Sequence, residues 1–244
     1  NLSSRSRQNS FFRFSCNEKL SLFFPLPTTS FIDFSDKIYG TRSIFDLNKN
    51  DQNCSMIAAR RGFTSERLAI PEQIHSSSIT CIDKPGNYGA SDGLITDNPK
   101  IILTLKVADC VPIYISSSKI IGLIHSGWQG TADGIVSNGV RKMFQMGENK
   151  KDIRVFLGPA IGVCCYEVDK EVAVHFNEKA KIKIRDGKWK VGLHEEIYLQ
   201  LTSLGIPSTN IKTSDICTFE SKNCHSYRRD GEKAGRMFAF MRLR

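Results

Sequence analysis

The chain has 244 residues, of which 40% are hydrophobic and 24% charged, and its formal net charge is +9 at pH 7. This composition is close to the average of globular proteins and excludes a collagenous, coiled-coil or wholly disordered chain. No apolar run approaches the roughly 20 residues that cross a bilayer, so we expect no membrane association. A chain of this length can bury enough apolar surface to fold without disulfides.

Residues 1–30 differ in composition from the remainder of the chain. They are rich in Ser, Arg and Phe and contain no acidic residue before Glu18. This composition is typical of an organelle transit peptide, and a degenerate chain end explains it equally well. The eight Cys residues form no CxxC pair, which favours reduced thiols in a cytoplasmic location. We therefore predict an atypical segment over 1–30 and one domain over 31–244.

From about residue 66 the chain alternates between patterns typical of strands and helices. The apolar runs 101–107, 111–115 and 120–124 predict strands, the last two joined by a serine turn. Apolar spacing over 135–144 predicts a helix that Gly147 ends. Further predicted elements are a strand over 153–157, helices over 168–180 and 193–204, and strands over 211–217 and 237–243. The mixture without strict alternation favours an α+β fold with mixed sheets.

Two histidines and one cysteine stand at the ends of these strands, beside small or turn-forming residues: His75, Cys110 and His125. Side chains at strand ends are held rigidly and face solvent, which suits catalysis. Two imidazoles and a thiolate also make a zinc-type ligand set with an open fourth position. An ordinary core cysteine with two hydrogen-bonded histidines remains the alternative.

Several segments follow the pattern of a known family. They appear in the family's order over roughly residues 45–244, and they are 73–75, 91–97, 108–112, 125–131, 157–162, 165–168, 226–231 and 235–237. Together they resemble the laccase-domain family, also called the YfiH or polyphenol-oxidoreductase-like family, which includes enzymes that act on purine nucleosides. Residues 27–33 depart from the family pattern, since they lack its usual Arg and glycine pair.

The resemblance implies a single α+β domain in which helices sandwich mixed sheets. It also implies a purine nucleoside phosphorylase, which converts adenosine, inosine or guanosine and phosphate into base and ribose 1-phosphate, with adenosine deamination as a second candidate reaction. The metal ligands would be His75, Cys110 and His125, which with Asp92 would form the catalytic group. We expect zinc rather than copper, purine nucleosides and phosphate as partners, and a monomer or weak homodimer.

Further residues are candidates for substrate binding. Arg228 and Arg229 could clamp a phosphate, or brace the C-terminal strand through buried acids. Gly130 and Thr131 belong to a turn that offers backbone N–H groups to an anion, or that is only a turn. The resemblance adds Gln73 to this set.

The remaining acids and thiols allow two interpretations each. Asp92 and Asp109 could orient a histidine or hydrogen-bond a purine ring, or could be ordinary turn acids. The neighbouring cysteines Cys164 and Cys165 could be redox-active, or one of them could face the core.

Two other functions compete with nucleoside chemistry. A multicopper oxidase needs many histidines in His-x-His pairs, whereas this chain has five His residues and no such pair. A single blue-copper site usually has a weak axial Met ligand, and no Met lies beside the motifs that contain His75, Cys110 and His125. A polyanion-binding module could use residues 222–244, which hold seven basic residues against two acids. There, however, Phe238 and Phe240 alternate with apolar residues, which indicates a core strand rather than a nucleic-acid platform.

Overall fold

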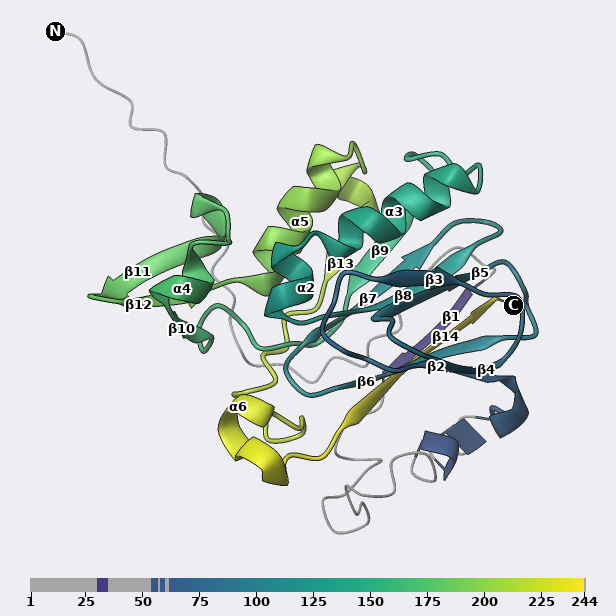
Figure 1. Ribbon diagram of the computed structural model, residues 1–244, viewed down its shortest axis with the longest axis horizontal. Helices are drawn as coiled ribbons and strands as arrows, with labels where there is room; N and C mark the ends of the chain where they lie inside the picture. The colour runs from purple at the N-terminus through teal and green to yellow at the C-terminus, as the bar shows by residue number, and fades with distance from the viewer. Residues whose placement is uncertain (1–29, 35–53, 57, 60–61, 244) are drawn as a thin grey trace, which may run out of the picture.

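The computed structural model describes residues 30–34, 54–56, 58–59 and 62–243 (Figure 1). The atypical segment predicted over 1–30 therefore lies outside the described residues, apart from Ser30. The described chain forms a five-stranded, a six-stranded and a three-stranded sheet. Within these residues, no helix combines the length and apolar character needed to span a membrane.

The six-stranded sheet is the centre of the molecule. Its order is β13-β9-β7-β8-β5-β3, with bounds β3 (Ile79–Cys81), β5 (Gly93–Thr96), β7 (Val111–Ser116), β8 (Ile121–Ser126), β9 (Arg154–Leu157) and β13 (Ile211–Thr213). The predicted strands over 101–107, 111–115, 120–124 and 153–157 are confirmed to within a residue or two at each end. All residues of β7 and β8 are buried, because both faces of the sheet are covered. Pro112, which cannot donate a ladder hydrogen bond, is the second residue of β7.

Helices cover one face of this sheet (Figure 1). They are α2 (Trp128–Ala132), α3 (Ile135–Gln145) and α5 (Leu193–Ser203). Their apolar sides pack on the sheet, with Val140 and Ile197 among fully buried residues of that core. The predicted helices over 135–144 and 193–204 are confirmed. The chain leaves α3 and α5 through Gly147 (φ 93°) and Gly205 (φ 81°), where a residue with a Cβ would be strained.

The five-stranded sheet packs on the opposite face. Its order is β1-β14-β6-β2-β4, with bounds β1 (Ser30–Phe34), β2 (Leu68–Pro71), β4 (Gly86–Tyr88), β6 (Ile102–Val107) and β14 (Met237–Leu243). Leu105 and Met241 of this sheet join Leu94 and Leu123 of the other in one buried cluster. The predicted strand over 237–243 is thus an interior strand. The α+β fold with mixed sheets is confirmed: one sheet lies between the helices and the second sheet.

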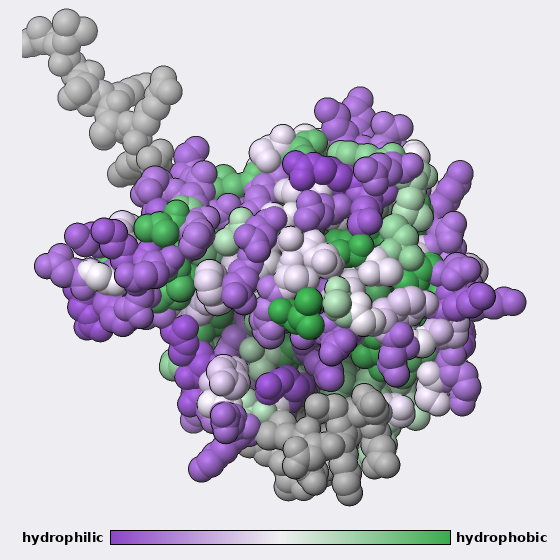
Figure 2. Space-filling model, viewed as in Figure 1, coloured by the Kyte–Doolittle hydropathy of each residue, from purple (hydrophilic) through white to green (hydrophobic). Residues whose placement is uncertain are grey.

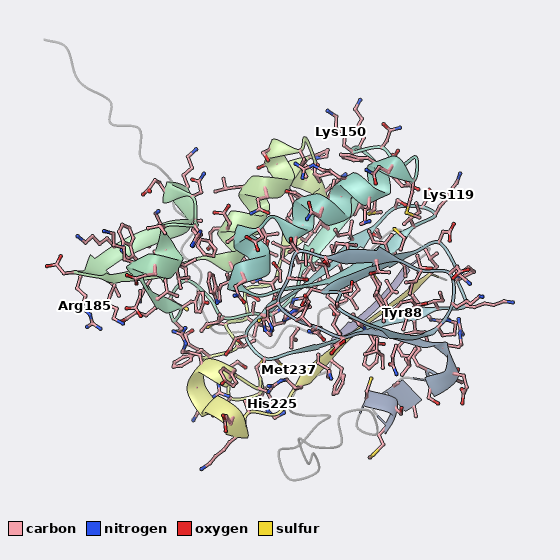
Figure 3. The ribbon with its side chains drawn as sticks, viewed as in Figure 1. Tyr88, Lys119, Lys150, Arg185, His225 and Met237 are labelled. Atoms are coloured by element: carbon pink, nitrogen blue, oxygen red, sulfur yellow. The ribbon has the colours of Figure 1, made fainter. Side chains whose placement is uncertain are left out.

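The two phenylalanines of the basic C-terminal segment are buried. Phe238 and Phe240 lie in a cluster with Phe63 on the outer face of the five-stranded sheet. The rings therefore form no exposed platform for stacking bases. Basic side chains project instead from the periphery, as Arg185, Lys119 and Lys150 do in Figure 3. Hydrophilic residues cover most of the face shown in Figure 2.

A small three-stranded sheet projects from the body (Figure 1). It consists of β10 (Glu167–Asp169), β12 (Lys188–Val191) and β11 (Lys181–Arg185). The predicted helix over 168–180 is therefore wrong: this stretch holds the end of β10, the single turn α4 (Lys170–Ala173) and the 3-10 turn η3 (Glu178–Ala180). Tertiary pairing overrides the helical spacing here, because Val168 pairs with Trp189 of the β11–β12 hairpin.

Short elements complete the chain. They are the 3-10 turns η2 (Ser65–Arg67), η4 (Ser208–Asn210) and η5 (Gly231–Lys233), and the helical turn α6 (Tyr227–Asp230). The strand predicted over 211–217 is confirmed only over its first three residues, Ile211–Thr213, which form β13. Beyond it the chain turns away, and Cys217 forms an isolated bridge with Ala160.

Candidate active site

The two histidines and the cysteine singled out in the sequence meet at one edge of the sheets. One ligand atom each of His75, Cys110 and His125 lies within 4.8 Å of the other two. The imidazole rings meet edge to face, with centroids 4.9 Å apart and planes at 82°. His75 follows β2, Cys110 precedes β7 and His125 lies near the end of β8. The strands β7 and β8 thus fix two of the three side chains.

Gly127 keeps the space between these side chains open. A Cβ at this position would lie 3.1 Å from Cδ2 of His75 and 3.2 Å from Sγ of Cys110. Such contacts would push the ring or the sulfur away. The glycine two residues after His125 in the sequence is therefore part of the site's geometry.

Asp92 organises both histidines from behind. It is fully buried and accepts hydrogen bonds from the backbone N–H groups of Ile74 (3.3 Å), His75 (3.0 Å) and Ser76 (2.6 Å) and from the Ser76 hydroxyl (2.8 Å). These bonds hold the turn in which His75 adopts a left-handed φ of 61°. The fifth bond joins Asp92 to Nδ1 of His125 at 2.8 Å.

The bond to Asp92 fixes the role of each His125 nitrogen. Because Nδ1 donates to the carboxylate, Nε2 is left for Cys110 or a metal. Burial alone would raise the pKa of Asp92, but the hydrogen bonds from His125 and Ser76 outweigh it and lower the pKa below its ordinary value. Asp92 does not line the cavity. It acts through the histidines, as a positioning residue.

Cys110 and His125 form a thiolate–imidazolium pair in the protein without metal. Burial alone would raise the pKa of Cys110, but the charge of His125 and hydrogen bonds from both histidines lower it to about 6. Burial alone would lower the pKa of His125, but Cys110 and Asp92 raise it to about 9. The thiolate is therefore present at neutral pH, ready to ligate a metal or act as a nucleophile.

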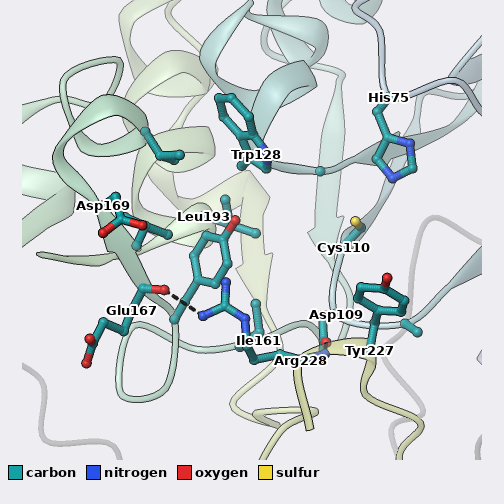
Figure 4. Close-up of a pocket in the computed structure, with 15 residues that line it drawn as sticks. His75, Asp109, Cys110, Trp128, Ile161, Glu167, Asp169, Leu193, Tyr227 and Arg228 are labelled. Carbon is teal, nitrogen blue, oxygen red and sulfur yellow. Dashed lines mark hydrogen bonds between the residues drawn. The ribbon is translucent and has the colours of Figure 1, made fainter. Parts of the chain in front are cut away.

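A cavity of about 550 Å³ opens next to this centre (Figure 4). His75 and Cys110 form one side of it. Among the other residues that line it are Trp128, Tyr166, Leu193, Tyr227 and Arg228. The volume is within the usual range for small-molecule sites. The walls combine aromatic and aliphatic side chains with the charged residues Asp109, Glu167, Asp169 and Arg228.

Arg228 brings a cation to the cavity wall. Its guanidinium lies 4.9 Å from the centroid of the Tyr166 ring and donates through Nη1 to the Glu167 carbonyl at 2.5 Å. Figure 4 shows it between Glu167 and Asp109. An arginine has five N–H donors, so one carbonyl does not exhaust its capacity.

Asp109 ties the C-terminal segment to Cys110. It is buried, has a left-handed φ of 82°, and accepts bonds from the Thr218 hydroxyl (2.5 Å), the Ser226 hydroxyl (3.0 Å) and the backbone N–H of Arg228 (2.7 Å). The residue before Cys110 therefore fixes α6, and with it the position of Arg228. Asp109 is held by these bonds in a backbone conformation that Asp tolerates better than most residues.

Arg229 is placed differently from its neighbour. Its Nη1 donates to the carbonyls of Thr218 (3.0 Å), Phe219 (2.7 Å) and Ser221 (3.2 Å), and its Nη2 donates to the Cys224 carbonyl at 2.8 Å. It also forms an ion pair with Asp230 at 2.9 Å. Arg229 does not line the cavity. Its contacts agree with the expectation that it braces the C-terminal segment, rather than with the expectation that it binds phosphate.

Three more predicted substrate-binding residues also lie outside the cavity lining. Gln73 bonds both backbone groups of Lys106, through Nε2 at 2.8 Å and Oε1 at 2.9 Å. Thr131 donates to the Gly127 carbonyl at 2.8 Å. A Cβ on Gly130 would lie 2.8 Å from the Ser76 carbonyl oxygen, so this glycine allows α2 to pack closely on the His75 turn. These residues support the walls of the site.

The sequence analysis did not single out the aromatic lining. Each of the three aromatic residues lies inside one of the segments that resemble the family: Trp128, Tyr166 and Tyr227. Their place in those segments was the only sequence evidence that could have identified them. Nothing in their spacing distinguishes them from core aromatics, because they come from three distant parts of the chain. Only the folded structure brings them around one cavity.

The donor set fits a zinc-type ion. Two imidazole nitrogens and a thiolate are the ligands that this borderline-soft cation prefers, and three protein ligands would leave a fourth position for water or substrate. Asp92 on Nδ1 of His125 is the partner usually found behind a ligating histidine. The residues present therefore fit the metal that the sequence predicts.

Fold and site together define a mixed-sheet α+β protein with a His–Cys–His centre beside an aromatic cavity. A family profile described as multi-copper polyphenol oxidoreductase laccase matches residues 43–244, and the chain belongs to this family. The resemblance predicted from the sequence is confirmed.

Relatives with known names and structures support this assignment. The chain is 35% identical to a purine nucleoside phosphorylase of Clostridium acetobutylicum over 206 residues, which cover 81% of this chain and 86% of that protein. It is 36% identical to the purine nucleoside phosphorylase YlmD of Geobacillus stearothermophilus over 224 residues, covering 80% and 81%. The crystal structure of the hypothetical protein YfiH from Bacillus licheniformis superposes with a TM-score of 0.81 at 30% identity, covering 88% of this chain and 93% of that one.

Proposed function

We propose that the protein is a purine nucleoside phosphorylase, which converts a purine nucleoside and phosphate into free base and ribose 1-phosphate. The observation that carries the proposal is the cavity of about 550 Å³, where His75 and Cys110 of the His–Cys–His centre share the wall with aromatic rings and one guanidinium. The names of the relatives from Clostridium acetobutylicum and Geobacillus stearothermophilus support it.

The cavity offers separate surfaces to the two substrates. The rings of Trp128 and Tyr227 can stack on a purine, which presents a π-face whichever base it is. The Arg228 guanidinium supplies the positive charge and paired donors that phosphate needs. We assign the base to the aromatic walls and the phosphate to the side that holds Arg228.

The reaction displaces the base from the sugar. An oxygen of phosphate forms a bond to C1′ of the ribose as the bond from C1′ to the base nitrogen breaks, and the base takes the electron pair and a proton. Zinc, when bound, supplies Lewis-acid stabilisation of charge at the centre. Asp92 keeps His125 in one tautomer through the hydrogen bond to Nδ1.

The arrangement of histidines disfavours a multicopper oxidase. All five histidines of the chain lie in the described residues, and only His75 and His125 belong to a group of potential metal ligands there. Neither of the two groups of potential metal ligands among the described residues includes His175, His194 or His225. One subunit therefore offers two histidines to a metal centre, fewer than a multicopper centre uses.

Product analysis tests the proposal. The purified protein is incubated with adenosine, inosine or guanosine, with and without phosphate, and the products are separated by chromatography. We expect free base and ribose 1-phosphate only when phosphate is present. Inosine formed from adenosine without phosphate would instead indicate a deaminase, and no product from any nucleoside would contradict the proposal.

A matched pair of cysteine variants assigns the activity to the site. Cys110→Ser removes the sulfur of the centre, whereas Cys81→Ser changes an exposed thiol on β3. We expect loss of base release in the first variant and unchanged release in the second. Equal activity in both variants would remove Cys110 from the mechanism.

A further inference from the structure

A second group of side chains close enough together to hold a metal ion lies outside the active site. One ligand atom each of Cys164, Cys165, Cys217 and Glu220 lies within 4.8 Å of the other three. None of these residues lines the active-site cavity. The group joins two turns far apart in sequence, one following β9 and one following β13.

Cys164 faces the surface, whereas Cys165 packs against the core, as one of the two interpretations expected. Cys164 is exposed and Cys165 is half-buried, while the third sulfur, Cys217, is buried. The Cys165 thiol lies 3.5 Å from Oε1 of Glu220, and the backbone N–H of Gly162 donates to Sγ of Cys217 at 3.3 Å. The sulfurs therefore point toward one another and toward a carboxylate.

We propose that these four side chains bind one zinc-type divalent cation in a structural site. Three thiolates and a carboxylate make four protein ligands, the number found in closed structural zinc sites. Sulfurs around a tetrahedral zinc ion lie roughly 3.8 Å apart, given Zn–S bonds of about 2.3 Å. Ligand atoms within 4.8 Å of one another need only a small contraction to reach that geometry.

The charges of the group favour a cation over a disulfide. No ion pair among the described residues involves Glu220, and the ammonium of Lys190 donates to the Cys164 carbonyl at 2.7 Å rather than to the carboxylate. One disulfide would use two sulfurs and leave a third thiol beside an uncompensated carboxylate. A divalent cation uses all four ligands and offsets two of the four negative charges that three thiolates and a carboxylate carry.

The site would hold the floor of the active-site cavity. The first turn follows Ile161, which lines the cavity and whose N–H donates to the Asp109 carbonyl at 3.0 Å. The second contains Thr218, whose hydroxyl donates to the Asp109 carboxylate and whose N–H donates to the Ala160 carbonyl at 2.9 Å. A metal here would lock together the two segments that hold Asp109.

Cobalt binding to the full-length reduced protein tests the site independently of any nucleoside activity. The variant Cys110→Ser serves as the background, because it removes the only sulfur of the His–Cys–His centre. In this background we expect one Co²⁺ per chain with an intense sulfur-to-cobalt charge-transfer band and the visible bands of tetrahedral cobalt, all lost when Zn²⁺ is added.

Further variants locate the ion. Adding Cys217→Ser to this background is expected to abolish the charge-transfer band, whereas adding Cys81→Ser leaves it unchanged. Glu220→Gln changes an exposed side chain and is expected to weaken Co²⁺ binding about tenfold or more, which keeps the test valid if the Cys217 variant does not fold.

Two results would overturn the proposal. The first is the absence of a sulfur-to-cobalt band in the Cys110→Ser protein. The second is a mass two hydrogens lower than that of the reduced chain, restored by dithiothreitol, with the disulfide mapped to two of Cys164, Cys165 and Cys217 in protein purified under reducing conditions.

Discussion

Asp92 and His125 are both buried, and the carboxylate accepts a hydrogen bond from Nδ1 of the imidazole at 2.8 Å. The same carboxylate holds the turn that carries His75. One side chain therefore fixes both histidines of the centre, although it does not line the cavity. The predictions below follow from this arrangement and from the residues around it.

Asp92→Asn should weaken both the fold and the metal site. The asparagine side chain has one acceptor oxygen where the aspartate has two, so at least one buried hydrogen-bond donor loses its partner. We expect the free energy of unfolding to fall by about 2–4 kcal/mol and zinc affinity to fall about 10–100-fold. Urea unfolding and metal titration measure these changes. Asp97→Asn, at an exposed position, is the control, and equal effects in both variants would contradict the role of Asp92.

The reactivity of Cys110 should depend on pH in protein stripped of metal. Because its pKa is about 6, the thiolate fraction falls as pH drops through 6, and alkylation by iodoacetamide slows in parallel. Peptide mass spectrometry follows Cys110 separately from the other cysteines. His125→Gln removes the neighbouring charge and should raise the apparent pKa. An unchanged profile in that variant would show that the pair does not exist.

The Cys110–His125 pair should contribute little pH dependence to stability. The pKa of Cys110 falls from 9.0 to about 6, so its stabilisation is complete above 9 and is lost as pH falls through 6. The pKa of His125 rises from 6.5 to about 9, so its stabilisation is complete below 6.5 and is lost as pH rises through 9. Between these values, folded and unfolded chains bind the same number of protons at the pair.

Urea unfolding of the metal-free protein at several pH values between 6.5 and 9 checks this balance. The difference in unfolding free energy between the wild-type protein and the double variant Cys110→Ser/His125→Gln should stay constant across the range. A difference that grows steadily with pH would mean that only one group of the pair has a shifted pKa.

Arg228→Ala and Arg229→Ala should separate substrate binding from stability. Arg228 is exposed at the cavity wall, so its loss should change the unfolding free energy by less than about 1 kcal/mol while raising the KM for phosphate. Arg229 donates to four carbonyls and pairs with Asp230, so its loss should cost about 2–4 kcal/mol. Thermal unfolding and phosphate kinetics measure both. The reverse pattern would assign the phosphate to Arg229.

Gly127→Ala should damage the centre more than the fold. The added methyl group would lie 3.1–3.2 Å from the His75 ring and the Cys110 sulfur and must displace one of them by a few tenths of an ångström. We expect weaker zinc binding with an unfolding free energy within about 1 kcal/mol of wild type. Unchanged zinc affinity, measured with a chelating indicator, would show that the ligands can shift without loss.

Much of the fold could be predicted because its central strands are continuous apolar runs. The hairpin β7–β8 is buried on both faces, and such strands differ clearly from the turns around them. The strands β10, β11 and β12 could not be predicted in this way. Ile182 and Ile184 are exposed there among basic residues, so the period-two pattern carries no signal of burial.

The candidate metal ligands of the site could be predicted from the sequence, but most of the residues that line its cavity could not. His75, Cys110 and His125 are chemically distinctive residues at strand ends. Arg228 and Arg229 are identical neighbours, and only the turn α6 directs one to the cavity and the other to backbone carbonyls. The group around Cys217 also depends on folding, because its turns are separated by β11, β12, α5 and β13.

The rate of base release from inosine at increasing phosphate concentration tests the central claim most directly. The account predicts a saturable dependence on phosphate, with one ribose 1-phosphate formed per hypoxanthine released and no release by Cys110→Ser. A rate independent of phosphate, or a Cys110→Ser variant as active as the wild-type protein, would contradict it.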